Sequence, residues 1–76
     1  MATIEEIKNI IKAEVSNRVN VDEIPVDDNL SDHDIDSLDR SSIFMEIEDK
    51  YGISIPDIDL ERLRTLNDIV TYVDNK

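Results

Sequence analysis

The sequence contains no cysteine and no tryptophan, and its 76 residues include only one glycine and two prolines. Without cysteine the fold has no disulfide, and any thiol chemistry requires a thiol that another molecule supplies. A signal-peptide hydrophobic region and a long apolar run are also absent. We therefore expect a soluble, cytoplasmic protein whose stability comes from its core.

Basic residues are scarce as well. The chain has 8 Lys and Arg against 19 Asp and Glu, which gives a formal net charge of −11. Nucleic acid is excluded as an expected partner because phosphate backbones bind surfaces rich in Lys and Arg. Anionic membrane surfaces are disfavoured for the same reason. The natural partner is a basic protein surface, and raising the salt concentration should weaken such an association.

The length predicts a single domain, residues 1–76, which we expect to be a monomer. A chain of this size buries only roughly 60% of its unfolded surface, which leaves no room for an enclosed active site beside a core. With 39% hydrophobic and 36% charged residues, the composition is that of a globular protein. We do not expect the chain to be an enzyme.

Two long helices are predicted at the ends of the chain. The first begins at Thr3, which has capping-box spacing with Glu6, and it should end near Ser16–Arg18. The last begins with Thr65 as the cap and Asp68 at the third helical position. Their apolar stripes have helical spacing and consist of Ile4, Ile7, Ile10, Ile11 and Val15 in the first helix and Leu66, Ile69, Val70 and Val73 in the last.

A third long helix is predicted to begin within Asp34-Ile35-Asp36-Ser37-Leu38-Asp39-Arg40. Asp36 is a good N-cap, which places Ser37 at the first helical position and Asp39 at the third. Gly52 stands where a helix commonly ends with a residue in the left-handed region. The stripe expected to face the core is Ile43, Phe44, Ile47 and Tyr51.

The segments between these helices complete the predicted fold. Residues 19–36 show no sustained hydrophobic periodicity. They are predicted to form an ordered loop that Ile24, Val26 and Leu30 hold to the core. Residues 53–55 are a connector, and Pro56-Asp57 opens a short, capped helix around Ile58–Leu63. The result is an all-α bundle of three main helices and one short one, in which the long loop lets the second helix run roughly parallel to or across the first.

The helix that begins at Ser37 has a second stripe, away from its core-facing side. Two apolar residues on it, Leu38 and Met45, are not explained by the core pattern. Apolar spots within an acidic surface suit docking to a protein that is basic around an apolar patch. The stripe consists of Leu38, Ser42, Met45 and Asp49, and it is bordered by Ser37, Ser41 and Glu48.

Asp36-Ser37-Leu38 resembles the D-S-L signature of the acyl carrier protein family, and the likeness covers the whole chain. It includes the acidic charge, the helix layout, the long loop, the glycine stop and Ile55-Pro56-Asp57. The resemblance implies an acyl-carrier-like bundle in which a phosphopantetheinyl transferase attaches 4′-phosphopantetheine to Ser37. The thiol of this arm would hold acyl groups as thioesters. The implied partners are that transferase and acyl-loading and acyl-processing enzymes with basic docking surfaces, which would contact Asp36, Leu38, Asp39, Ser42, Met45, Glu48 and Asp49.

Elementary electrostatics agrees with this assignment in part. A phosphate at a helix N-terminus meets free N–H groups and the positive end of the helix dipole. The carboxylates of Asp36 and Asp39 would repel it, and the resemblance implies that the transferase offsets them with a metal ion and basic residues.

The chain also departs from the family pattern. His33-Asp34-Ile35 stands where Leu-Gly-x is common, and Ser42 stands where a glutamate is common. These differences favour a dedicated fatty-acid- or polyketide-like pathway with its own partners. Two alternatives stay open, an aminoacyl or peptidyl carrier of a nonribosomal pathway and a non-carrier acidic helical interaction module.

Other readings of the same residues are weaker. Ser37 alone could be an unreactive residue at a helix start. Asp32, Asp34 and Asp36 alternate like the start of a calcium loop, but the sixth and twelfth positions hold Ser37 and Ile43 where Gly and Glu are needed. We therefore predict no metal site.

The single histidine, His33, is expected to be solvated. It could form a triad with Ser37 and an aspartate only if the chain supplied a cleft and an oxyanion hole. A domain of this size can hardly provide them.

Overall fold

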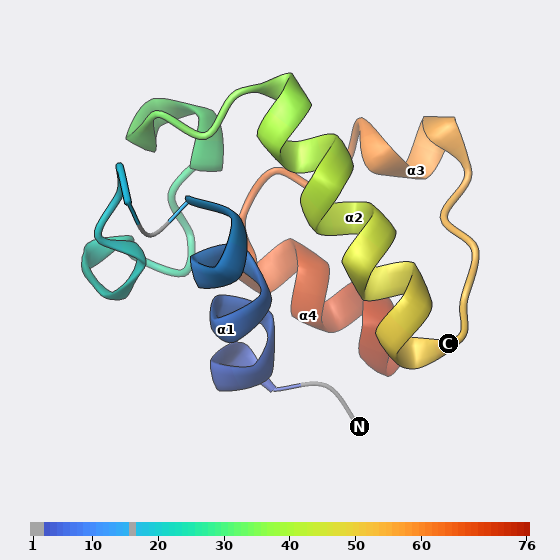
Figure 1. Cartoon of the computed structure of the whole chain (residues 1–76). Coiled ribbons are helices and arrows are strands. Elements are labelled where there is room, and N and C mark those ends of the chain that lie inside the picture. Colours follow the sequence, from blue (N-terminus) through green and yellow to red (C-terminus); the bar gives the residue numbers. More distant parts are fainter. Residues whose placement is uncertain (1–2, 16) are drawn as a thin grey trace.

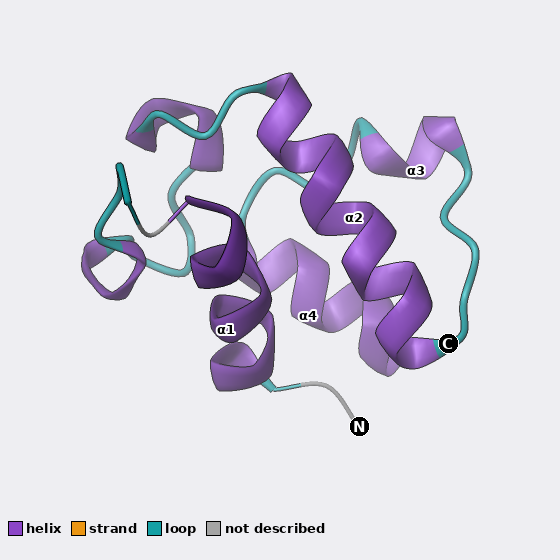
Figure 2. Cartoon of the chain, in the orientation of Figure 1, coloured by secondary structure: helices purple, strands orange, loops and turns teal. Residues whose placement is uncertain are grey.

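Helices make up the regular structure of the chain, for which a computed structural model describes residues 3–15 and 17–76. Figure 2 shows no strand in these ranges, and residues 53–55 form the expected connector. The predicted all-α class is therefore confirmed. The helices are α1 (Ile4–Val15), α2 (Ser37–Tyr51), α3 (Asp57–Leu60) and α4 (Leu66–Asp74), and the 3₁₀ turns η1 (Val21–Glu23) and η2 (Leu30–His33) lie between α1 and α2 (Figure 1).

The three long helices begin as the sequence predicts. The amide of Glu6 donates to Thr3 Oγ1 at 3.1 Å and the Glu6 carboxylate accepts from the Thr3 amide. Reciprocal boxes of the same kind join Asp36 to Asp39 and Thr65 to Asp68. Each box satisfies amides that a helix start otherwise leaves without partners. At the other end of α1, the end was predicted near Ser16–Arg18. Ser16 lies outside the described residues, and residues 17 and 18 form a turn after α1.

The short helix α3 differs from the prediction. Its N-cap is Pro56, which makes no side-chain cap hydrogen bond, and Asp57 is the first helical residue instead of a cap. The helix ends at Leu60 and not at Leu63. A single turn without a side-chain cap does not propagate far.

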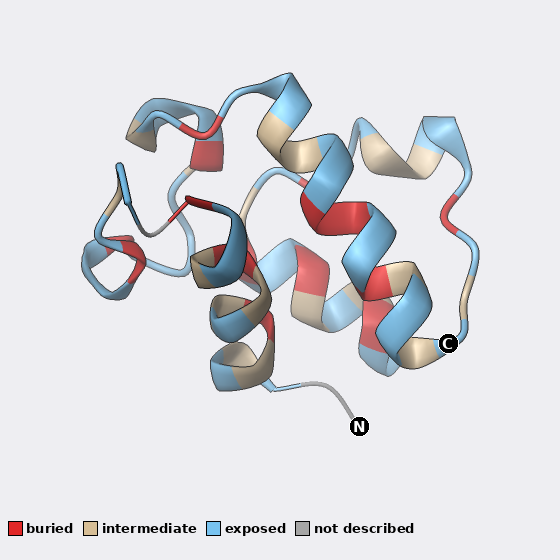
Figure 3. Ribbon diagram, viewed as in Figure 1, coloured by how far each residue is buried: buried red, intermediate tan, exposed pale blue. Residues whose placement is uncertain are grey.

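The core lies where α1, α2 and α4 face one another (Figure 3). Ile24 and Leu30 anchor the long loop as predicted, but Val26 is 36% exposed. This segment is fixed by its backbone instead, because the Val26 carbonyl accepts from the Asn67 amide at 3.0 Å. The buried apolar residues are Ile7, Ile11, Val15, Val21, Ile24, Leu30, Ile35, Ile43, Phe44, Ile47, Ile55, Leu63, Leu66, Ile69 and Val73.

The direction of α2 corrects the prediction that it runs parallel to or across α1. Lys50 near the end of α2 pairs with Glu6 in the first turn of α1 at 3.8 Å. At the opposite end of both helices, Arg18 pairs with Asp39 at 2.6 Å. The two helices are therefore antiparallel, as Figure 1 also shows. A parallel α2 would need a loop that returns to the start of α1. The η1 and η2 turns coil the loop, so it is too short to make that return.

Helix α3 contributes no buried side chain, and in Figure 3 it lies at the edge of the bundle. Polar contacts from α2 and α4 hold it and the segments beside it. These contacts, called the α3 ties below, are Ile55 N to Glu48 Oε2 at 2.7 Å, Arg40 Nη2 to Leu60 O at 3.1 Å and to Leu63 O at 2.9 Å, and Tyr72 Oη to Asp59 Oδ2 at 2.8 Å.

Every helix in the described part of the chain is too short or too polar to cross a lipid bilayer.

Candidate functional site

Ser37 is the first residue of α2, and its side chain is exposed. The capping box fixes the backbone around it, with Asp39 N donating to Asp36 Oδ1 at 2.9 Å and Asp36 N donating to Asp39 Oδ2 at 3.3 Å. The amides of Ser37 and Leu38 make no hydrogen bond with the described residues. The structure therefore presents a hydroxyl group on a rigid helix start, beside two free N–H donors.

A cation from the turn after α1 offsets part of the acidic charge at this helix start. Arg18 Nη2 donates to Asp39 Oδ2 at 2.6 Å. This hydrogen bond is the main reason why the pKa of Asp39 is lowered, and the pKa of Arg18 is raised in return. Sequence reasoning did not find Arg18, because the contact joins residues that are 21 positions apart.

A cavity of about 170 Å³ opens next to Ser37, between α2 and α3. Arg40 forms part of its wall, and the guanidinium lies 5.8 Å from the centre of the Phe44 ring. Its Nε is buried without a hydrogen-bond partner among the described residues. Sequence reasoning did not single out Arg40 either. The cavity is lined by Ser37, Arg40, Ser41, Phe44, Leu60 and Glu61.

The second stripe of α2 is on the surface. Leu38 is 79% exposed and Met45 is 66% exposed, so neither belongs to the core, and Ser42 and Asp49 are exposed with them. Glu48 is half-buried and holds the Ile55 amide.

Another apolar side chain is exposed on the neighbouring helix. Ile58 in α3 is 63% exposed. The sequence placed Ile58 in a helix but gave no sign of which way its side chain faces.

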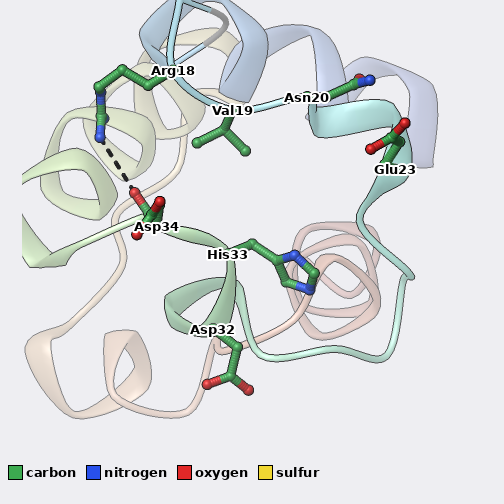
Figure 4. A pocket seen from close by; sticks show the side chains of 7 residues that line it. All are labelled: Arg18, Val19, Asn20, Glu23, Asp32, His33 and Asp34. Atoms are coloured by element: carbon green, nitrogen blue, oxygen red, sulfur yellow. Dashed lines mark hydrogen bonds between the residues drawn. The ribbon is translucent and has the colours of Figure 1, made fainter.

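The loop before Ser37 forms a separate polar hollow of about 370 Å³, shown in Figure 4. Arg18 Nη1 donates to the Asp34 carbonyl at 3.4 Å across it. His33, which we expected to be solvated, is half-buried, and its Nε2 lies 3.0 Å from Asp28 Oδ2. Asp34 has a φ of 65° and therefore lies in the left-handed region. No group of three or more His, Cys, Asp or Glu residues that could hold a metal ion occurs within the described ranges.

Comparisons with known proteins agree on the class of protein that this fold and helix start define. The family described as "Phosphopantetheine attachment site" matches residues 5–73. The acyl carrier protein of Thermotoga maritima is 37% identical over 100% of this chain and 98% of its own length. That of Campylobacter hominis is 36% identical over 99% and 94%. The meromycolate extension acyl carrier protein of Mycobacterium leprae is 43% identical over 92% of this chain and 54% of its own length.

The chain therefore belongs to the phosphopantetheine attachment family, as the resemblance of the D-S-L motif implied. The described residues fit the group that gives the family its name. An exposed hydroxyl stands at a helix start, and beside it lies a cavity lined in part by Arg40, whose buried Nε has no hydrogen-bond partner among the described residues. When the arm is bound, it supplies the thiol that this cysteine-free chain lacks.

Proposed function

We propose that Ser37 carries the 4′-phosphopantetheine arm and that the chain, residues 1–76, is a non-catalytic carrier domain that holds acyl intermediates as thioesters. The observation that supports this most directly is the position of Ser37. It is an exposed residue of a D-S-L motif, at the capped first position of α2, inside the part of the chain that matches the family.

The side chains around Ser37 support modification by another enzyme over self-catalysis. Asp36 and Asp39 are engaged in the capping box, and His33 pairs with Asp28. When the Ser37 oxygen bonds to the phosphorus of the arm of coenzyme A, the bond from that phosphorus to adenosine 3′,5′-diphosphate breaks, the nucleotide leaves and the serine proton passes to a base. The carboxylates and the imidazole near Ser37 already make the hydrogen bonds named above, and none of them donates to or accepts from the Ser37 hydroxyl in the described structure. We therefore assign the base to a phosphopantetheinyl transferase.

For the cargo, we propose acyl groups of a fatty-acid- or polyketide-like pathway. The relatives named above are acyl carrier proteins, and one of them is named for meromycolate extension. An aminoacyl or peptidyl cargo is the alternative. Loading the holo protein with matched acyl and aminoacyl coenzyme A donors and its pathway enzymes would separate the two, since only the cognate class should be processed further.

For the partners, we propose the transferase and acyl-loading and acyl-processing enzymes with basic docking surfaces. The exposed Leu38 and Met45 would fill apolar spots on the partner, and the surrounding carboxylates would pair with its cations. In this proposal Asp39 and Glu48 also position their neighbours, because they already bind Arg18 and the Ile55 amide. The remaining contacts are Asp36, Ser42 and Asp49.

The attachment site can be tested by intact mass. After incubation with coenzyme A and a broad-specificity phosphopantetheinyl transferase, the wild-type chain should gain the mass of one arm. Ser37→Ala should fold, because alanine is a good helix residue, and should gain nothing. Ser41→Ala is the matched control, as Ser41 is exposed, lies one turn further along α2 and lines the same cavity. A full mass gain by Ser37→Ala would show that the site is elsewhere.

A further inference from the structure

Arg40 and Ser37 lie on the same side of α2. They are three residues apart, a spacing at which helical side chains are neighbours, and both line the cavity between α2 and α3. Arg40 Nη2 donates to the carbonyls of Leu60 at 3.1 Å and Leu63 at 2.9 Å. These two bonds hold the guanidinium at the cavity wall, one turn from the Ser37 hydroxyl.

The guanidinium of Arg40 still has hydrogen-bonding capacity to spare. Its Nε is buried and has no partner among the described residues, and its Nη1 makes no hydrogen bond with them. A buried donor without an acceptor costs free energy, more so on a charged group. The acceptors that match an arginine best are carboxylate and phosphate oxygens. The structure thus has an unused phosphate-binding group beside the serine.

The acidic residues at the start of α2 favour a cation next to the arm. A phosphodiester on Ser37 adds a negative charge next to Asp36 and Asp39. The other nearby cation, Arg18, is already paired with Asp39 at 2.6 Å and lines the polar hollow on the loop side instead of the cavity beside Ser37. Arg40 is the arginine in that cavity.

We propose that Arg40 binds the phosphodiester of the arm on Ser37 through a guanidinium N–H and so fixes the root of the arm at the mouth of the α2–α3 cavity. This inference rests on the proposed attachment to Ser37. The consequence is that the arm of this chain starts in a defined direction, over Phe44 and Leu60. The free amides of the helix start attract the phosphate but do not by themselves direct the rest of the arm toward this cavity.

The first test compares the apo and holo forms of four proteins: the wild type, Arg40→Gln, Arg40→Lys and Arg62→Gln. Here loading means attachment of the arm to Ser37, and intact mass checks it. Arg62 is a matched control because it is exposed and lines a different cavity, on the α4 side. Loading should raise the unfolding midpoint of the wild type and Arg62→Gln by about 4 °C or more. This rise in the unfolding midpoint should vanish in Arg40→Gln. It should be partial in Arg40→Lys, which keeps the positive charge but lacks the planar guanidinium that binds two oxygens at once. Each variant is compared with its own apo form. The hydrogen bonds that an Arg40 substitution removes from Leu60 and Leu63 are therefore absent from both forms and do not affect the difference between their unfolding midpoints.

The second test begins with the wild-type protein alone and then uses two variants that carry the arm. In the wild-type protein, at least one Arg40 guanidinium N–H resonance should move when the arm is attached, and its exchange with water should slow as it gains the phosphate acceptor. In loaded Arg40→Gln the ³¹P resonance should move from its wild-type position, and in loaded Arg62→Gln it should not. Arg40 guanidinium N–H resonances that are all the same in apo and holo protein would overturn this inference and leave attachment to Ser37 intact. Failure of the wild type to gain the arm would overturn both.

Discussion

At the scale of single residues, Asp34 shows how this chain replaces a glycine. Its φ of 65° and ψ of 23° place it in the left-handed region at the end of η2, and it is the only described residue other than glycine with a positive φ. Aspartate enters this region at less cost than most residues because its short side chain can hydrogen-bond locally. The turn keeps a backbone conformation that suits glycine, although the residue at position 34 is an aspartate.

This reading predicts an order of stability at position 34. Asp34→Gly should leave the free energy of unfolding unchanged or raise it, whereas Asp34→Ala should lower it by about 1 kcal/mol, because alanine pays the steric cost of the left-handed region. Chemical denaturation measures both. At Asp32, which has no positive φ, the order should reverse, with alanine more stable than glycine. The same order at both positions would contradict the role assigned to Asp34.

Met45 and Ile47 are two apolar residues of α2 with opposite surroundings. Met45 is 66% exposed and Ile47 is fully buried. Met45→Ala should therefore cost less than about 1 kcal/mol of stability, and Ile47→Ala about 2–5 kcal/mol. Thermal unfolding compares them. The same Met45 change should slow transfer to a cognate enzyme, and an unchanged transfer rate would remove Met45 from the proposed docking surface.

At the scale of elements, α3 is the part of the bundle that polar contacts hold in place. None of its own residues is fully buried, so between the buried Ile55 and Leu63 that flank it its position depends on the partly buried Leu60 and on the α3 ties from Glu48, Arg40 and Tyr72. Segments with few buried apolar contacts open at low free energy. Since α3 also forms one wall of the cavity beside Ser37, we expect that wall to be the easiest part of the site to move.

The two tyrosines provide a test of these ties. Tyr72→Phe removes the hydrogen bond to Asp59 and should cost about 0.5–1.5 kcal/mol. Hydrogen exchange should speed up in residues 57–63 and stay unchanged in α1. Tyr51→Phe is the matched control. The Tyr51 hydroxyl is buried without a hydrogen-bond partner in the described structure, so removing it should be neutral or stabilising. Equal losses in the two variants would show that the Tyr72 bond does not hold α3.

At the scale of the whole molecule, the net charge decides which protein surfaces the chain is expected to attract. A formal net charge of −11 on 76 residues produces a field that attracts basic surfaces and that salt screens. The acidic residues also repel one another in the folded state. Pairs such as Arg18–Asp39 and Lys12–Asp22 offset part of this repulsion, and the pKa of each aspartate in them is lowered, first by its hydrogen bond to the cation.

Association with the transferase should therefore depend on salt. We expect the association rate to fall severalfold between low and physiological ionic strength. Asp49→Asn, on the proposed docking stripe, should reduce this dependence. Glu14→Gln removes the same charge from an exposed position on α1, and it should change the salt dependence of the association rate less than Asp49→Asn does. Stopped-flow kinetics at several salt concentrations would measure both, and rates that do not vary with salt would contradict electrostatic docking through this face.

Much of this protein could be predicted from local sequence, for a physical reason. The capping boxes at Thr3, Asp36 and Thr65 and the left-handed stop at Gly52 are set by neighbouring residues, so a short window contains their cause. The helical periods likewise separated buried Ile43 and Ile47 from exposed Leu38 and Met45. Ser37 could be placed at the start of α2 because a D-S-L motif and a cap coincide there.

Only the tertiary structure decided the features that depend on distant contacts. The antiparallel course of α2 depends on how η1 and η2 use up the length of the loop, which no local pattern encodes. Val26 faces solvent because its backbone, not its side chain, binds the start of α4. No local pattern singled out Arg18 or Arg40, which the fold brings to Asp39 and to the carbonyls of Leu60 and Leu63, 20 or more positions away. Long, charged side chains choose their partners from whatever the packed backbone places within reach, and a short window of sequence does not contain those partners.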